Sequence, residues 1–416
     1  MAHAPTTAER PAAPLALHGQ SVEGVHQCVH CGLCLASCPT YVELGTEAES
    51  PRGRIQLVRG LAAGTLQPTH EVARHLDLCL GCRACETACP SGVPYGRLIE
   101  SVRPLVEARR SAGARGVRRL LASVLTSPRL ARLLFAPARL VAGRRALARL
   151  PFFGYAAALA PRRMPALPPV IEPEGMPRGT AVLLTGCVAS ALFHDTNVRT
   201  ARLLARAGVR VLVRADLGCC GALAAHLGAG DLAHRLARDV VRVVERSGAD
   251  WIVTNAAGCG AHLRGLGHVL ADDAGGATVA ARTRDALELL AELGLPPPSG
   301  LLPRRVAVHD PCHLAHGQGV RGAVRELLAT IPGIGLVDLA ESDWCCGSAG
   351  TYNLTEPAMA ARLLDRKLDN VARSGAELVV AANPGCLLQM RAGALARGLD
   401  VAIEHPIDVL ARAHAC

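Results

Sequence analysis

Aromatic side chains are scarce in this chain of 416 residues: Phe, Trp and Tyr make up 2% of it, whereas half of the residues are apolar. A packed core must therefore be built mainly from Ala, Leu and Val. The sequence also lacks an uncharged apolar run of about 18 residues, the length that a transmembrane helix needs. No apolar stretch follows a basic start in the first 20 residues, so we expect no secretory signal peptide.

Acidic residues are nearly missing from one segment. Residues 103–149 contain 12 arginines and a single acid, Glu107, although the net charge of the whole chain is only +10. The rest of the chain is roughly balanced, which argues against a broad surface for nucleic acid.

Leu, Val and Ala stand between these arginines at helical spacing. Three interpretations stay open: amphipathic helices on an anionic membrane, a docking face for partner subunits, or a solvated helical layer over the core. We expect a cytoplasmic protein, and the first interpretation places it peripherally on the inner face of the cytoplasmic membrane.

Cysteine, in contrast, is abundant, and the 17 cysteines fall into tight groups. Such grouping favours metal binding over disulfides in a reducing cytosol. Two groups, at 28–39 and 79–90, have the spacing C-x2-C-x2-C-x3-C-P. In this pattern three thiolates hold one [4Fe–4S] cluster and the fourth cysteine reaches the other cluster. The predicted ligands are Cys28, Cys31, Cys34 and Cys89 for one cluster, and Cys79, Cys82, Cys85 and Cys38 for the other.

A zinc ribbon or a disulfide scaffold is the alternative for these eight cysteines, but structural zinc sites usually combine pairs of cysteines rather than runs of four. Between the two runs, residues 40–78 contain helical patterns. A mostly helical two-cluster ferredoxin domain is therefore expected, rather than a small β-rich one.

An internal repeat follows. Cys187, the pair Cys219-Cys220 and Cys259 recur as Cys312, the pair Cys345-Cys346 and Cys386, with offsets of 125, 126 and 127 residues. Three landmarks at nearly constant offset indicate two domains of one fold. The predicted division is a tail (1–20), a ferredoxin-like domain (21–100), an Arg-rich helical segment with a Pro-rich linker (101–178), and two repeats (179–300 and 301–416).

Each repeat alternates apolar strand-like runs with helical stretches. The runs lie at 181–186, 209–213 and 251–256 in the first repeat, and at 305–310, 335–340 and 377–383 in the second. The repeat cysteines follow the ends of these runs. In an open α/β sheet this is the edge where ligands bind, so the predicted fold class is multidomain, with a helical ferredoxin domain followed by two α/β domains.

Each repeat thus offers four cysteines, and adjacent cysteines in a cytosolic chain suggest metal–thiolate chemistry. The repeats resemble the cysteine-rich CCG domains of heterodisulfide reductase and its relatives. The motif of that family ends in C-x2-C, whereas here Gly-Ala-His262 follows Cys259 and Leu-Leu-Gln389 follows Cys386. Three alternatives stay open for each repeat: a further iron–sulfur cluster, another metal such as zinc, or metal-free redox-active or structural thiols.

The chain as a whole resembles the iron–sulfur subunit of glycolate oxidase. The resemblance rests on both ferredoxin runs, on S-P-R-G-R at 50–54 and on W-C-C-G-S-A-G-T-Y-N-L at 344–354. It implies that a partner flavoprotein oxidises glycolate to glyoxylate, while this chain takes electrons from the reduced flavin and passes them towards quinone. The sequence has no convincing flavin or nicotinamide fingerprint, which agrees with a flavin on the partner and with no catalytic residue on this chain.

Rival interpretations are a CCG-type disulfide reductase, and the iron–sulfur subunit of a related glycerol-3-phosphate or lactate dehydrogenase. Two smaller questions concern residues near the cysteines. Arg52 and Arg54 are predicted to offset the negative charge of a cluster. The histidines His309, His313 and His316 either pack or serve as ligands or proton-transfer groups.

Overall fold

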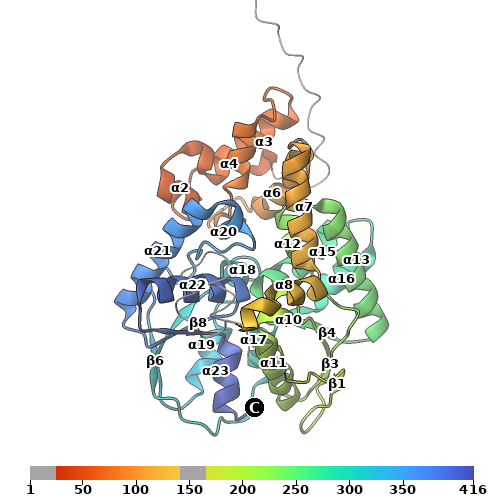
Figure 1. Cartoon of the computed structure of the whole chain (residues 1–416), viewed down its shortest axis with the longest axis vertical. Helices are drawn as coiled ribbons and strands as arrows, with labels where there is room; N and C mark the ends of the chain where they lie inside the picture. The colour runs from red at the N-terminus through yellow and green to blue at the C-terminus, as the bar shows by residue number, and fades with distance from the viewer. Residues whose placement is uncertain (1–24, 141–164) are drawn as a thin grey trace, which may run out of the picture. The chain divides into compact units, whose positions relative to one another are not determined.

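The computed structural model describes residues 25–140 and 165–416 (Figure 1). The predicted tail (1–20) and part of the Arg-rich segment therefore lie outside the described residues. The chain divides into two compact units, Met1–Arg115 and Gly116–Cys416. The finer division into five parts stays a prediction.

The first unit is helical throughout its described part, as the patterns between the cysteine runs predicted. Its elements are α2 (Pro39–Leu44), η1 (Glu47–Glu49), α3 (Pro51–Ala62), α4 (His70–Asp77), α5 (Ala84–Thr87) and α6 (Tyr95–Glu107), and α7 (Ala112–Thr126) begins in it. Its core combines aliphatic side chains such as Ile55, Leu76 and Val102 with the buried Cys79 and Cys85. The cysteines are thus part of the packing itself.

The second unit opens with the rest of α7 and with α8 (Pro128–Leu140), and the first repeat follows. Its elements are β1 (Val170–Ile171), β2 (Gly179–Leu183), α10 (Cys187–Leu192), α11 (His194–Arg206), β3 (Val209–Leu212), α12 (Ala222–His226), α13 (Gly230–Ser247), β4 (Trp251–Thr254), α14 (Ala257–Arg264), α15 (Leu266–Val269), α16 (Ala274–Arg282), β5 (Thr283–Asp285) and α17 (Ala286–Leu293). The strand order is β1-β3-β2-β4-β5, and all pairs except β1–β3 are parallel.

The second repeat builds a parallel sheet of order β7-β6-β8-β9. Its elements are β6 (Arg304–His309), α18 (Cys312–Ala315), α19 (Ala323–Ala329), β7 (Ile334–Val337), α20 (Tyr352–Thr355), α21 (Pro357–Ser374), β8 (Leu378–Ala381), α22 (Pro384–Arg397), β9 (Ala402–Glu404) and α23 (Pro406–Ala413). The central strands are short runs of β-branched and aliphatic residues that are buried on both faces, as parallel strands require.

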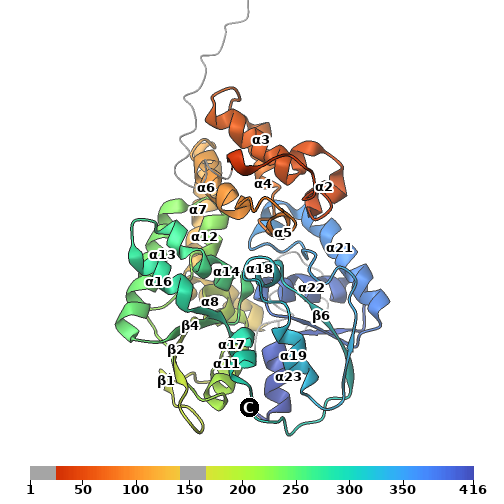
Figure 2. The ribbon, with the colours of Figure 1, turned by 180° about the vertical axis from the view of Figure 1, so that it is seen from behind.

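The two repeats share one hydrophobic core. Helices α11 and α17 of the first repeat pack against α23 and α19 of the second, between the two sheets (Figure 2). Two hydrogen bonds join the strand ends: Ala257 N–H donates to the Ala382 carbonyl (3.2 Å), and His405 Nε2–H donates to the Asn255 carbonyl (2.8 Å). The carboxyl ends of the central strands of both sheets are thereby held together.

All six predicted strands are present within a few residues of their expected bounds, which confirms the fold class. Three further strands, β1, β5 and β9, have only two or three residues each. The Pro-rich linker predicted within residues 101–178 supplies one of them: Val170–Ile171 pairs antiparallel with β3 at the sheet edge. A two-residue strand has too few positions to show a pattern in the sequence.

Candidate iron–sulfur and metal sites

Both four-cysteine runs fold into the same kind of loop. The second and fourth residues after the first cysteine have positive φ in each run: His30 (56°) and Gly32 (84°) in one, Gly81 (66°) and Arg83 (65°) in the other. Successive N–H groups around left-handed residues form a concave surface that suits phosphates and iron–sulfur clusters. The matching backbone indicates that the two loops are built for the same kind of centre.

The thiols of the two runs come together across the sequence. Burial raises the pKa of Cys85 well above its ordinary value, and the thiols of Cys82, Cys79 and Cys38 raise it further. Cys38, from the first run, therefore lies within electrostatic range of Cys85 in the second run, as well as of Cys34 in its own run. Cys89, the fourth cysteine of the second run, is half-buried and packs against the same core as Cys28 and Cys34.

Hydrogen-bond donors surround these thiols. The Gly81 N–H and the Tyr95 hydroxyl donate to Cys79 Sγ (3.4 and 3.7 Å). The Thr40 hydroxyl lies 3.4 Å from Cys38 Sγ and donates its own hydrogen to the Glu49 carbonyl (2.7 Å). Donors that point at sulfur stabilise thiolate ligands and tune cluster potentials. Eight free thiols in two matching loops, with two donors on Cys79 Sγ, fit a pair of iron–sulfur clusters.

The S-P-R-G-R segment starts helix α3 next to this site. Ser50 caps the helix, because its hydroxyl accepts a hydrogen bond from Gly53 N–H (2.9 Å), and Pro51 occupies the first turn. Position 53 requires glycine, since a Cβ there would lie 1.9 Å from the Glu47 carbonyl oxygen. The tight packing of this turn fixes the direction of the next residue, Arg54.

Arg54 is almost completely buried, with 1% of its surface exposed. Its guanidinium donates to the Glu49 carboxylate (2.7 Å), to the Glu49 carbonyl (2.7 Å), to the Thr40 hydroxyl (3.1 Å) and to the His75 carbonyl (2.7 Å). His75 Nδ1 lies 2.6 Å from the other Glu49 oxygen. A buried guanidinium needs such full pairing, because an unpaired buried charge is strongly destabilising.

The electrostatic neighbours of Arg54 include the cysteines. Burial alone would lower the pKa of Arg54, but Tyr95, Cys79, Cys38 and Glu49 raise it above its ordinary value. Arg54 is therefore a permanent cation within electrostatic reach of Cys79 and Cys38. In the same loop, Arg52 pairs with the Glu47 carboxylate (2.7 Å) and donates to the His30 carbonyl (3.1 Å), and it lies within electrostatic range of Cys34 in the first run.

In the first repeat the four cysteines converge from three strand ends. Cys187 begins α10, the pair Cys219-Cys220 precedes α12, and Cys259 lies in the first turn of α14. The Sγ atoms of Cys187 and Cys219 are 3.5 Å apart, and those of Cys220 and Cys259 are 3.1 Å apart. Gly221 has a φ of 96°, and the turn around it aims its own N–H at Cys219 Sγ (3.5 Å).

The second repeat repeats this arrangement. Cys312 begins α18, Cys345 and Cys346 precede Gly347, and Cys386 lies in the first turn of α22. Gly347 has a φ of 84°, and a Cβ there would lie 2.5 Å from the Ala360 carbonyl oxygen. The glycine after each cysteine pair is therefore required by backbone conformation.

The second cysteine of each pair interacts with the thiols of two neighbouring cysteines. The thiols of Cys219 and Cys259 lower the pKa of Cys220 well below its ordinary value. In the second repeat, Cys345 and Cys386 lower the pKa of Cys346 in the same way. The equivalent cysteine in each quartet therefore ionises more readily than an ordinary thiol, and the thiolate is the form of cysteine that binds metal ions. In the second repeat the pKa of Cys312 is lowered as well, chiefly by Cys345.

Cysteines of both repeats line one cavity of about 440 Å³. The seven cysteines in its wall are Cys187, Cys220, Cys259, Cys312, Cys345, Cys346 and Cys386. The rest of the described wall is mostly apolar, with side chains such as Leu125, Phe135 and Leu192, and contains no Asp, Glu, Lys or Arg. The duplication therefore places two cysteine groups around a shared, weakly polar space.

Comparison with known proteins agrees with this geometry. Residues 24–93 match a 4Fe-4S dicluster domain, and residues 181–264 and 306–391 each match the cysteine-rich CCG domain. The chain is 35% identical to the glycolate oxidase iron-sulfur subunit of Escherichia coli, over 96% of both chains. The probable glycolate oxidase iron-sulfur subunit of Bacillus subtilis is also 35% identical, over 93% of both chains. The chain belongs to the family of glycolate oxidase iron–sulfur subunits.

A more distant relative matches less of the chain. The lactate utilization protein A of Exiguobacterium is 26% identical to it, over 55% of this chain and 95% of the relative. The family assignment confirms the resemblance inferred from the cysteine runs, the S-P-R-G-R segment and the W-C-C-G sequence.

This family member has His262 and Gln389 where the CCG motif ends in a further cysteine. Both side chains are buried, and Gln389 accepts a hydrogen bond from the Asn353 amide (3.0 Å). His262 faces the cysteine pair of the first repeat, since a Cβ on Gly221 would lie 3.2 Å from His262 Nε2. That nitrogen has no hydrogen-bond partner among the described residues.

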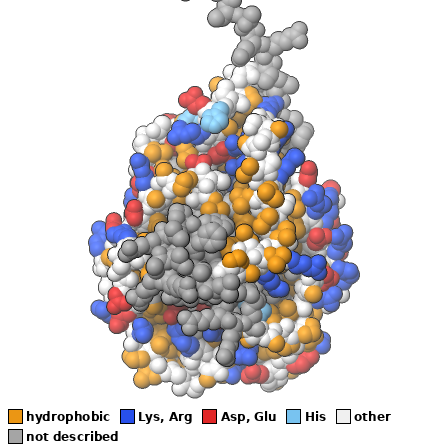
Figure 3. Space-filling view, viewed as in Figure 1, with side chains coloured by type: hydrophobic (Ala, Val, Ile, Leu, Met, Phe, Trp, Pro, Cys, Tyr) orange, Lys and Arg blue, Asp and Glu red, His pale blue; other side chains and the backbone are white. Residues whose placement is uncertain are grey.

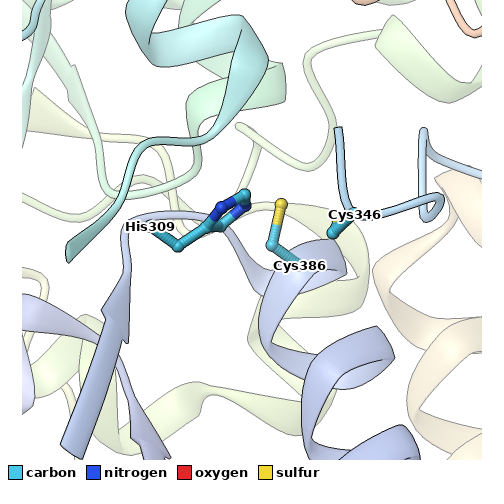
Figure 4. Close-up of side chains that lie close together, drawn as sticks. All are labelled: His309, Cys346 and Cys386. Carbon is cyan, nitrogen blue, oxygen red and sulfur yellow. The ribbon is translucent and has the colours of Figure 1, made fainter. Parts of the chain in front are cut away.

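The three histidines around Cys312 have different contacts in the structure. His313 Nδ1 lies 3.6 Å from Cys312 Sγ, and His316 contacts the Arg321 guanidinium (3.1 Å). His309 is the last residue of β6, is 1% exposed, and points towards Cys386 (Figure 4). Neighbouring histidines in one loop look alike in the sequence, and only the place of His309 at the strand end distinguishes it.

The Arg-rich segment forms α7 and α8 where it is described. Hydrophobic side chains gather on the surface over these helices (Figure 3), including Val117, Leu120 and Leu133, which are 65–69% exposed. Arg119 and Arg132 are exposed in the same helices. None of the described helices is both long and apolar enough to cross a membrane.

Proposed function

We propose that this chain is the electron-transfer subunit of a glycolate-oxidising complex. In this proposal a partner flavoprotein oxidises glycolate to glyoxylate, and this chain takes electrons from the reduced flavin and delivers them towards quinone. The main support is the 35% identity, over more than nine-tenths of both chains, to relatives named glycolate oxidase iron-sulfur subunits. The lactate relative, which matches 55% of this chain, supports the rival substrate less well.

The proposed cluster ligands cross between the two runs. One cluster is held by Cys28, Cys31, Cys34 and Cys89, and the other by Cys79, Cys82, Cys85 and Cys38. The electrostatic proximity of Cys38 to Cys85, and the position of Arg54 near both Cys38 and Cys79, support this assignment. When bound, such clusters accept and donate one electron at a time.

The residues around Cys38, Cys79, Cys82 and Cys85 orient these thiols and place a positive charge near them. The Thr40 hydroxyl contacts Cys38 Sγ and accepts a hydrogen bond from the Arg54 guanidinium, and the Tyr95 hydroxyl donates to Cys79 Sγ. Arg54 supplies a fixed positive charge, which favours an additional electron nearby. We expect the Arg54 network to raise the reduction potential of the centre held by Cys79, Cys82, Cys85 and Cys38.

The exposed apolar surface of α7 and α8, with its arginines, is the proposed contact with the flavoprotein or with the inner face of the cytoplasmic membrane. Exposed apolar patches rimmed by charge are typical of interaction sites. The weakly polar cavity between the repeats supports a route to an apolar acceptor such as quinone.

The decisive experiment combines the anaerobically prepared chain with the flavoprotein subunit proposed as its partner. Glycolate should reduce the clusters, followed by electron paramagnetic resonance, only when the flavoprotein is present. L-lactate and glycerol 3-phosphate serve as competing substrates. Reduction of the clusters by one of these substrates but not by glycolate would show that the chain serves a different dehydrogenase.

The ligand assignment is tested in the same preparation. We expect about eight irons per chain, since each [4Fe–4S] cluster holds four. Cys38→Ser should remove the same resonance signal as Cys82→Ser, whereas Cys89→Ser should remove the same signal as Cys31→Ser. Cys416→Ser is the matched control and should keep both signals. The opposite pairing of signals would reject the crossover.

A CCG-type disulfide reductase is the second candidate, and the cavity lined by seven cysteines favours it. The isolated chain, supplied with reduced viologen and a disulfide, would then produce thiols without any flavoprotein. No turnover in the presence of fully reduced clusters would exclude this activity.

A further inference from the structure

The end of strand β6 carries a buried histidine with two thiols close to its ring. His309 is 1% exposed, and neither Nδ1 nor Nε2 makes a well-formed hydrogen bond in the described structure, although the imidazole is close enough to the Cys346 thiol to interact with it. Burying an imidazole without a well-formed hydrogen bond costs free energy, because both nitrogens lose their hydrogen bonds to water. A fold that keeps such a group beside thiols calls for an explanation.

Two cysteines stand next to it. The nearest ligand atoms of His309, Cys346 and Cys386 all lie within 4.8 Å of one another, and all three residues are buried (Figure 4). In a tetrahedral zinc site, bond lengths of about 2.3 Å to sulfur and 2.0 Å to nitrogen place the ligand atoms roughly 3.5–3.8 Å apart. The three side chains thus need only small adjustments to bind one ion.

We propose that the second repeat binds a single zinc ion through His309, Cys346, Cys386 and Cys345. The fourth ligand is assigned to Cys345 because its thiol hydrogen-bonds to Cys346 in the same turn. Imidazole and thiolate are the ligands that zinc prefers. A [4Fe–4S] cluster is a poorer fit, because its ligands bind four separate irons and must stand farther apart than the ligands of one ion.

The residues around the proposed zinc site orient its ligands and compensate its net charge. The Asn383 amide donates to Cys386 Sγ (3.4 Å), the type of outer contact that orients a metal ligand. Zinc with three thiolates and a neutral imidazole carries one negative charge. Lys367, which is fully buried, is an electrostatic neighbour of Cys346, Cys345 and Cys386 and supplies the opposite charge.

The first repeat does not offer the same site. The residue 125 positions before His309, the offset between Cys187 and Cys312, is Leu184, which is buried in the hydrophobic core. We therefore expect one zinc ion per chain from this site, held by the second repeat. The proposal is independent of the electron-transfer function, since zinc has no redox chemistry under these conditions.

The test is the zinc content of the anaerobically purified full chain and of its His309→Leu variant, which copies Leu184 and suits a buried position. We expect about one zinc per chain in the parent and loss of that ion in the variant. His316→Ala is the matched control, because it removes a neighbouring histidine outside the ligand group, and it should keep the zinc. His309→Cys should restore binding, since cysteine is also a zinc ligand.

A second readout uses Co²⁺ added to the chain after zinc removal. Thiolate-to-cobalt absorption should appear in the parent, and in His309→Cys its bands should shift because sulfur replaces nitrogen. Cluster absorption and thermal unfolding verify that each variant is folded. Equal zinc content in the parent and in folded His309→Leu, or iron with sulfide lost in place of zinc, would overturn the proposal.

Discussion

The two repeats have the same fold and cysteine order but differ in the buried groups behind the cysteines. After β2 the first repeat has Leu184, where the second has His309 at the end of β6. Helices α13 and α21 both have 18 residues, and their eleventh residues are Val240 and Lys367. Conversely, His262 of the first repeat corresponds to an amide, Gln389. Duplication thus preserved the backbone that collects four thiols, while buried polar residues diverged and made the two sites chemically different.

The repeats also differ at the caps of their last helices. Asp285 caps α17 through a bond from Leu287 N–H (2.9 Å), whereas His405 caps α23 through a bond from Ile407 N–H to Nδ1 (3.1 Å). Burial raises the pKa of Asp285 to about 7 and lowers the pKa of His405. One cap therefore favours the protonated carboxyl and the other the neutral imidazole.

The largest change in stability is expected when Asp285 is replaced. Its pKa is higher in the folded chain than in the unfolded chain, so its contribution to stability is lost as the pH rises from about 4 to 7. Asp285→Asn keeps the cap and removes this loss. At pH 8 the variant should be more stable by up to about 4 kcal/mol, at 1.36 kcal/mol per pKa unit.

Urea denaturation at pH 5 and pH 8 measures this difference between variant and parent. Asp239→Asn, on the exposed face of α13, is the control and should show no such dependence. An Asp285→Asn variant with the same pH profile as the parent would contradict the buried-carboxyl explanation.

The next largest change in stability is expected when the glycines after the cysteine pairs are replaced. Gly347→Ala should destabilise the chain by about 3 kcal/mol, because alanine is strained at positive φ and its Cβ overlaps the Ala360 carbonyl. Gly221→Ala should cost about 1–2 kcal/mol, since the nearest atoms to its Cβ are 3.2 Å away. Chemical denaturation of the metal-free chain measures both. Equal losses would mean that strain alone, without the backbone overlap, sets the cost.

The smallest effect concerns the buried cation. Lys367→Met imitates the apolar Val240 and should weaken zinc binding about tenfold, the lower range for residues next to metal ligands. Without metal, the variant should be as stable as the parent or more stable, because burying an ammonium is costly. Competition with a chromophoric chelator measures the affinity, and Val240→Met is the control in the first repeat. An unchanged dissociation constant for zinc would show that Lys367 does not contribute to the site.

Much of this arrangement was predictable from local sequence. The six central strands follow from short aliphatic runs, and the two ferredoxin loops follow from the spacing of their cysteines. The short strands β5 and β9 were not predictable, because three residues pair only when the neighbouring strand is already in place. Both arginines of the S-P-R-G-R segment lie within electrostatic range of predicted ligand cysteines, Arg54 near Cys38 and Cys79 and Arg52 near Cys34, while each also pairs with a glutamate. Charge compensation of a cluster by them stays a prediction.

The sequence by itself determined the type of protein, since cysteine spacing, duplication and the S-P-R-G-R segment are local patterns that need no neighbours to be recognised. Only the tertiary structure decided which cysteines and histidines meet. Cys38 reaches the second run, seven repeat cysteines line one cavity, and His309 rather than His313 or His316 faces Cys346 and Cys386. The physical reason is that these contacts join residues tens of positions apart, and their distances follow from how strands and helices pack rather than from any spacing along the chain.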